Sequence, residues 1–129
     1  MSFDIREEDT FRQVQVLFNE YFPYLKIEFF EKSSPVHLTP GTYKPVLNKD
    51  RKLTEFSKTI TRIAPFTINK ELNVKMVEEY IQSFYSLNAL VYRKSGNVWL
   101  ETTVTGNWTL EEQNKQGRLI TLQLQDSRA

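Results

Sequence analysis

The chain has 129 residues, with 17 basic and 16 acidic side chains and no cysteine. This length fits one domain that buries roughly two thirds of its unfolded surface without disulfides or metals. The balanced charge gives the chain as a whole no electrostatic attraction to nucleic acid or anionic membrane. The absence of cysteine excludes disulfides, thiolate metal sites, thiol nucleophiles and iron–sulfur clusters.

The sequence contains no signal for export or membrane insertion. Its first residues are acidic where a signal peptide carries basic residues, and no apolar region follows them. No window approaches the roughly 18 apolar residues of a membrane helix. We therefore expect a single domain over residues 1–129 of a soluble, cytoplasmic protein that does not contact a membrane.

Two segments share one pattern when the sequence is shifted against itself by 63 positions, which aligns residues 3–33 with residues 66–96. Each segment begins and ends with a short alternating strand, and between the strands apolar residues follow the spacing of one helix face. These helix positions are Phe11, Val14, Phe18 and Tyr21 in the first segment and Val74, Val77, Ile81 and Phe84 in the second. The pattern predicts an internal repeat of two strand–helix–strand units, and chance agreement between two amphipathic helices is the alternative.

The ends of both predicted helices carry recognisable signals. Thr10 and Asn73 are suitable N-caps, and Gln13 completes a capping box with Thr10. Pro23 ends the first helix because it has no N–H to donate, and the second helix stops near Ser86.

The two units are joined by a segment of different composition. Residues 34–54 hold three of the five prolines and the only histidine, His37, which predicts an irregular, exposed arm. Residues 59–63 predict one further strand, which ends before Pro65.

The last third of the chain predicts a hairpin. The cluster from Lys94 to Asn97 favours a turn between the strand that ends the second unit and another strand that extends to Val104. After it, Thr109 is expected to cap a short helix that Gly117 closes. Alternating apolar residues at 118–125 then predict a final strand at a sheet edge.

These elements together indicate an α+β fold. We expect an open-faced sandwich in which a mainly antiparallel sheet is covered on one face by two main helices, in a ferredoxin-like or related arrangement of the two units.

Motifs for catalysis and cofactor binding are missing from the sequence. The four glycines are scattered, so they form neither a dinucleotide fingerprint nor a phosphate-binding loop. A single histidine cannot form a two-histidine metal site. The acidic runs 7–9, 78–79 and 111–112 fall on or just before predicted helices, where solvated carboxylates are ordinary. We therefore expect no metal, no cofactor and no catalytic residue, and a non-enzymatic protein.

The candidate binding residues are Arg93, Trp99, Glu101 and Trp108. They lie close together in the sequence, and both tryptophans of the chain are among them. Tryptophan and arginine anchor protein interfaces because each combines a large contact area with a polar group. If the two strands pair through the turn, an aromatic ring, an arginine and a carboxylate could lie on one sheet surface. The alternative is that Trp99 fills the core, Trp108 packs at the head of the helix, and Arg93 and Glu101 form a cross-strand ion pair.

Basic residues are concentrated between positions 44 and 62. Six cations stand there against two acids: Lys44, Lys49, Arg51, Lys52, Lys58 and Arg62. This segment is the candidate for contact with phosphate, but the aromatic and basic run typical of RNA-binding sheets is absent around Gly96. Nucleic acid is therefore the third choice of partner.

The segment from Arg93 to Thr103, with the run from Trp108 to Asn114, resembles a family of small uncharacterised bacterial proteins. The resemblance covers only the last third of the chain. It implies a bacterial cytosolic protein and supplies no activity, cofactor or catalytic residue.

Three functions follow from the sequence. The first is a protein-interaction or self-associating module, because an open sheet face bearing Phe30, Val91 or Trp99 would be an apolar patch. The second is a small-molecule-binding or enzymatic domain, which requires a pocket with a buried titratable group such as Glu101 beside Arg93. The third is a nucleic-acid binder through residues 44–62.

Overall fold

The computed structural model describes residues 1–31, 44–56 and 63–126. Residues 34–43 of the predicted arm, with His37, lie outside these residues, and so does the predicted strand at 59–63 apart from Ile63. The described part of the arm is not fully exposed as expected, because Val46 and Leu53 are buried in the core. The strands and helices are β1 (Ser2–Ile5), α1 (Phe11–Tyr21), β2 (Leu25–Glu31), β3 (Lys44–Pro45), β4 (Phe66–Asn69), α2 (Val74–Tyr85), β5 (Leu87–Ser95), β6 (Val98–Glu101) and α3 (Leu110–Asp126), and one 3-10 turn, η1, spans Leu53–Phe56.

The strands form two antiparallel sheets. β1 pairs with β4 in a two-stranded ribbon, and the other strands form a sheet in the order β3-β2-β5-β6. The α+β prediction is confirmed. The strands of the two predicted units are divided between the sheets, so they do not form one common sheet and the ferredoxin-like arrangement is not confirmed.

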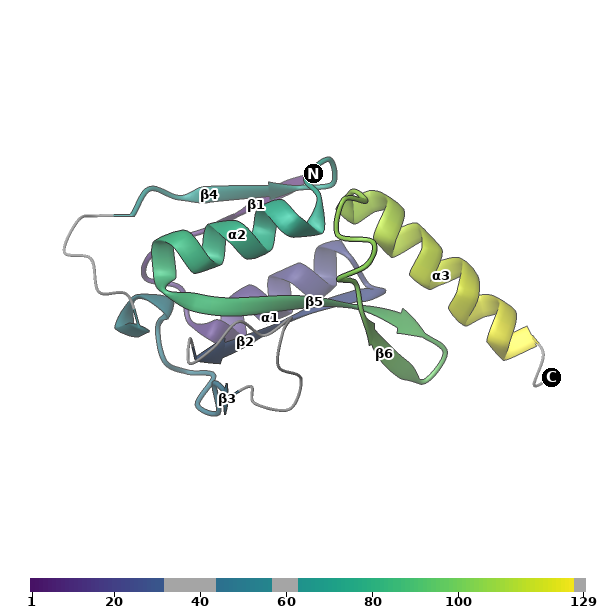
Figure 1. Ribbon diagram of the computed structural model, residues 1–129, viewed down its shortest axis with the longest axis horizontal. Helices are drawn as coiled ribbons and strands as arrows, with labels where there is room; N and C mark the ends of the chain where they lie inside the picture. Colours follow the sequence, from purple (N-terminus) through teal and green to yellow (C-terminus); the bar gives the residue numbers. More distant parts are fainter. Residues whose placement is uncertain (32–43, 57–62, 127–129) are drawn as a thin grey trace.

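The two main helices lie between the ribbon and the larger sheet (Figure 1). Each presents its apolar stripe to the interior, and Phe18 of α1 and Ile81 of α2 are fully buried. Phe3 of the ribbon packs edge-on against Phe18, with ring centroids 6.4 Å apart, while Phe29 of β2 packs against Phe11 at 5.0 Å. One continuous core therefore joins both sheets through the helices.

The predicted helix caps are confirmed. The Oγ1 atom of Thr10 accepts the N–H of Gln13 at 3.2 Å, and the Gln13 side chain accepts the N–H of Thr10 at 2.8 Å. Asn73 accepts the N–H of Met76 at 2.8 Å. Each cap satisfies a backbone donor that the first turn of a helix leaves without a partner.

We expect Thr10→Ala to lower the free energy of unfolding by about 1 kcal/mol, since the capping oxygen is lost. Thr10→Ser keeps that oxygen and is expected to retain most of the stability. Urea denaturation of the two variants measures the difference, and equal losses would mean that the capping oxygen does not stabilise α1.

β2 and β5 are the central strands of the larger sheet, and each has a stretch of backbone that pairs with no neighbouring strand. Side chains of the helices hydrogen-bond to this backbone. On β2, the Gln15 and Asn19 side chains of α1 donate to the carbonyls of Ile27 and Leu25 at 3.0 and 2.9 Å. On β5, Glu78 of α2 accepts the N–H of Val91 at 3.1 Å. These contacts block strand addition at those positions.

The predicted C-terminal strand is wrong. Residues 110–126 form one helix, α3, and Gly117 lies inside it rather than after its end. Gly117 is buried against the sheet, where a Cβ atom would stand 3.0 Å from Arg93 Cγ, 3.0 Å from Tyr24 Cβ and 3.2 Å from Tyr24 O. This glycine allows the helix to approach the sheet closely instead of terminating the helix.

Within the described residues, no helix is long and apolar enough to cross a membrane.

Candidate functional site

The pairing of β5 with β6 determines where the predicted site residues point. Arg93 is opposite Leu100, Lys94 is opposite Trp99, and Tyr92 is opposite Glu101. Directly opposed residues share a face and neighbours along a strand alternate. Arg93 therefore lies on the face toward α3, whereas Trp99 and Glu101 lie on the opposite, outer face.

Both predicted arrangements of Arg93, Trp99 and Glu101 are consequently wrong, whereas Trp108 does lie at the head of α3, beside the capping residue Thr109. Arg93 does not share a surface with Trp99 and Glu101, and it forms no cross-strand ion pair with Glu101. Trp99 is half-buried on the outer face and does not fill the core. The pocket that was expected to hold Glu101 beside Arg93 is excluded for the same reason.

The structure does bring Arg93 and Trp108 together. The guanidinium carbon of Arg93 lies 5.5 Å from the centroid of the Trp108 ring. Its Nη1 donates to Gln113 Oε1 at 3.0 Å, and Gln113 Nε2 donates to the carbonyl and the hydroxyl of Thr105, each at 2.8 Å. Gln113 is fully buried. The arginine therefore attaches α3 and the preceding loop to the sheet.

Further polar contacts continue along α3. Thr121 accepts the N–H of Gly96 at 3.1 Å in a buried position, and Asn114 Oδ1 accepts the N–H of Tyr24 at 2.9 Å. Gly96 adopts φ +66° in the hairpin turn that the sequence predicted, and Leu124 packs against it. Small and polar residues thus hold α3 to the sheet, and they were missed because hydrophobic periodicity does not detect them.

The outer face of the hairpin carries an aromatic and basic group. The Lys26 ammonium lies 5.0 Å from the Trp99 ring centroid and 5.4 Å from that of Tyr92. Glu101 is exposed beside them. Phe30 and Leu90 are buried on this face, and Val91 belongs to the core on the other face. The outer face is therefore not the continuous apolar patch that the sequence suggested.

One group of exposed apolar side chains lies on β6 and α3. Val98 and Leu100 are 56% and 45% exposed, and both lie on the α3 side of the sheet. Leu119, Leu122 and Leu124 of α3 are also exposed, in a stretch, 119–125, without any charged residue.

The outer edge of β6 has backbone groups that face away from the sheet. The N–H of Thr102 donates to the carbonyl of Val91 at 3.3 Å, so by alternation the backbone of Leu100 also faces β5. The N–H and C=O groups of Trp99 and Glu101 then point to the free edge. In the described chain no strand pairs with this edge, in contrast to the covered positions on β2 and β5.

The predicted basic segment uses part of its charge internally. Lys49 forms an ion pair with Glu28 at 3.3 Å, and Arg51 forms one with Glu55 at 2.6 Å. Lys58 and Arg62 lie outside the described residues. These two cations are thus less available to phosphate than the sequence suggested.

The carboxylate of Glu78, which was expected to be solvated on a helix face, is mostly buried. Burial raises the pKa of Glu78 to about 7, the hydrogen bond from the Val91 N–H acts in the opposite direction, and the charges of Glu101 and Glu79 raise it further. Glu78 borders a shallow cleft of about 280 Å³ with Thr103 and Asn107. Among the described residues no three histidine, aspartate or glutamate side chains converge as metal ligands would.

No protein-family model matches this chain, and comparisons with curated proteins and with solved structures find no similar protein.

Proposed function

We propose that this protein is a non-enzymatic, self-associating module in which two copies pair through the free edge of β6 and continue the sheet from one copy into the other. The observation that carries this proposal is the contrast between the edges. Side chains of α1 and α2 occupy the outer backbone of β2 and β5, whereas β6 presents exposed apolar side chains and backbone groups that pair with no described residue.

The charge of the chain favours a second copy as the occupant. The net charge is +1, so two copies repel each other little. The exposed apolar surface of β6 and α3 carries no charge that would select a charged partner; it consists of Val98, Leu100 and residues 119–125. A two-fold axis perpendicular to the sheet keeps each face continuous, so the apolar side chains of both copies meet on the same side.

One register pairs all the backbone N–H and C=O groups that Trp99 and Glu101 direct to the free edge in both copies. If Leu100 lies opposite Leu100 of the second copy, Trp99 pairs with Glu101 across the axis, and both exchange backbone hydrogen bonds. Glu101 then faces Trp99 rather than another carboxylate, so like charges do not oppose each other. A strand this short gives a small interface, of the kind found in transient complexes.

Sedimentation equilibrium tests the proposal. We expect the apparent mass to rise from the 15.3 kDa of one chain toward twice that value between micromolar and high micromolar concentrations. Leu100→Lys places a charge in the apolar contact and is expected to weaken association at least tenfold.

Val104→Lys is the matched control. Val104 is fully exposed and lies outside β6, so the same change there should leave association unaltered. A wild-type chain that stays monomeric at high concentration, or equal effects of the two lysines, would contradict pairing through β6.

The bacterial origin and the cytoplasmic location remain predictions from the sequence, as does the internal repeat.

A further inference from the structure

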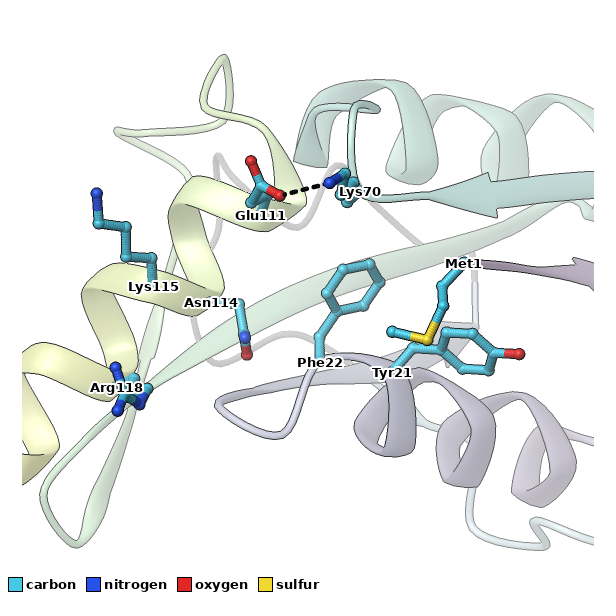
Figure 2. Close-up of a pocket in the computed structure, with 8 residues that line it drawn as sticks. All are labelled: Met1, Tyr21, Phe22, Lys70, Glu111, Asn114, Lys115 and Arg118. Atoms are coloured by element: carbon cyan, nitrogen blue, oxygen red, sulfur yellow. Dashed lines mark ion pairs between the residues drawn. The ribbon is translucent and has the colours of Figure 1, made fainter.

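A pocket lies between α3 and the C-terminal end of α1. It is open, with a volume of about 390 Å³, and Met1 also lines it (Figure 2). Tyr21 and Phe22 form its apolar wall, and Asn114 faces them from α3. This volume falls within the range of small-molecule sites.

The charge around the pocket is strongly positive for a nearly neutral protein. Three cations line it, Lys70, Lys115 and Arg118, against one carboxylate, Glu111. Lys70 and Glu111 neutralise each other in an ion pair of 3.1 Å at the rim. Within the described chain, Lys115 and Arg118 form no ion pair, so the wall on α3 retains two positive charges.

These two charges indicate the class of ligand. A phosphate monoester carries about −1.5 to −2 charges at neutral pH, which matches two unpaired cations. The guanidinium of Arg118 has the planar geometry that binds phosphate oxygens in pairs. The Lys115 ammonium extends away from the aromatic rings in Figure 2, and its flexible stem allows it to turn toward an anion.

The opposite wall can contact an apolar group. Phe22 is 6% exposed and Tyr21 is half-buried, so the wall is fixed by the core behind it. The ring of Tyr21 packs against Phe3 at a centroid distance of 4.9 Å. A flat group attached to the phosphate would pack against this rigid wall while the anion contacts α3.

We propose that this pocket binds a small phosphate monoester whose organic part is aromatic or otherwise flat and apolar. The ligand bridges α1 and α3, with its phosphate on Lys115 and Arg118 and its ring against Tyr21 and Phe22. This site is separate from the edge of β6.

The test is a titration of the isotope-labelled full chain with phenyl phosphate, followed by NMR of the backbone amides. We expect saturable shifts at residues 21–24 and 111–118. Inorganic phosphate lacks the ring and phenol lacks the charge, so each should bind at least fivefold more weakly than phenyl phosphate.

Matched double variants identify the cations. Lys115→Gln with Arg118→Gln should weaken phenyl phosphate binding at least tenfold. Arg6→Gln with Lys75→Gln removes the same number of exposed charges outside the pocket and should leave binding unchanged.

Three results would overturn the proposal: no saturable shifts, equal binding of phenyl phosphate and inorganic phosphate, or equal losses in the two double variants. Binding that persists in Leu100→Lys distinguishes this site from the pairing of β6, because the two proposals can fail separately.

Discussion

Gly117→Val is expected to lower the free energy of unfolding by about 2–4 kcal/mol, although valine favours a helix more than glycine does. The reason is the close approach of α3 to the sheet. A first side-chain carbon at this position stands 3.0 Å from two side-chain atoms and 3.2 Å from the backbone oxygen of Tyr24. The backbone cannot move aside without loosening the contacts of Asn114 and Thr121 with the sheet.

Gln125→Val provides the control for this substitution. Gln125 is exposed on the same helix, so valine there changes helix propensity without touching the sheet. Chemical denaturation of both variants measures the difference. If Gly117→Val were as stable as Gln125→Val, α3 could not be docked against Arg93 and Tyr24 as described.

Glu78→Gln is expected to stabilise the protein at alkaline pH and to have little effect at acidic pH. Burial raises the pKa of Glu78 from 4.5 to about 7 in the folded chain, so ionising this carboxyl costs more in the folded state than in the unfolded state. The wild-type protein therefore loses stability as the pH rises from 4.5 through 7, and the loss is complete above that range. Glutamine removes the ionisation and keeps an oxygen that can accept the N–H of Val91.

We expect the stabilisation by Glu78→Gln to be about 1–3 kcal/mol larger at pH 8 than at pH 4.5, after allowance for the partial exposure of the carboxyl. Urea denaturation at the two pH values measures it. Glu79→Gln is the control, because Glu79 is the exposed neighbour on the same helix. A gain that does not change with pH, or that appears equally in Glu79→Gln, would contradict the buried ionisation of Glu78.

The first two helices were predictable because their signals are local. Thr10, Gln13 and Asn73 form caps through hydrogen bonds within a few residues. The apolar positions expected to face the core are buried except in the last turns, where Tyr21 is half-buried and Phe84 is exposed because Tyr85 is buried in its place. The hairpin was predictable for the same reason, since Gly96 supplies the positive φ that its turn requires.

The third helix was mispredicted because its buried face is not apolar beyond Leu110. The residues that face the sheet are Gln113, Gly117 and Thr121, whose spacing of four is helical but whose side chains are polar or absent. The leucines that alternate at 122 and 124 are exposed, so their strand-like pattern did not report burial. Periodicity predicts structure only where hydrophobic residues are the buried ones.

The candidate site was partly predictable. Strand alternation alone could have separated Arg93 from Trp99 once the two-residue turn at Gly96 and Asn97 fixed the register. The contact of Arg93 with Trp108 depends on the docking of α3, which joins segments that no local pattern connects. The pocket likewise depends on the approach of α3 to the end of α1.

Amide hydrogen exchange of β6 at low and high protein concentration tests the central claim most directly. The N–H groups of Trp99 and Glu101 point to the free edge, whereas that of Leu100 faces β5 within the same chain. Pairing of two copies predicts that exchange at Trp99 and Glu101 slows at least tenfold at the high concentration while Leu100 is unchanged. Exchange at Trp99 and Glu101 that stays fast at both concentrations would contradict self-association through this strand.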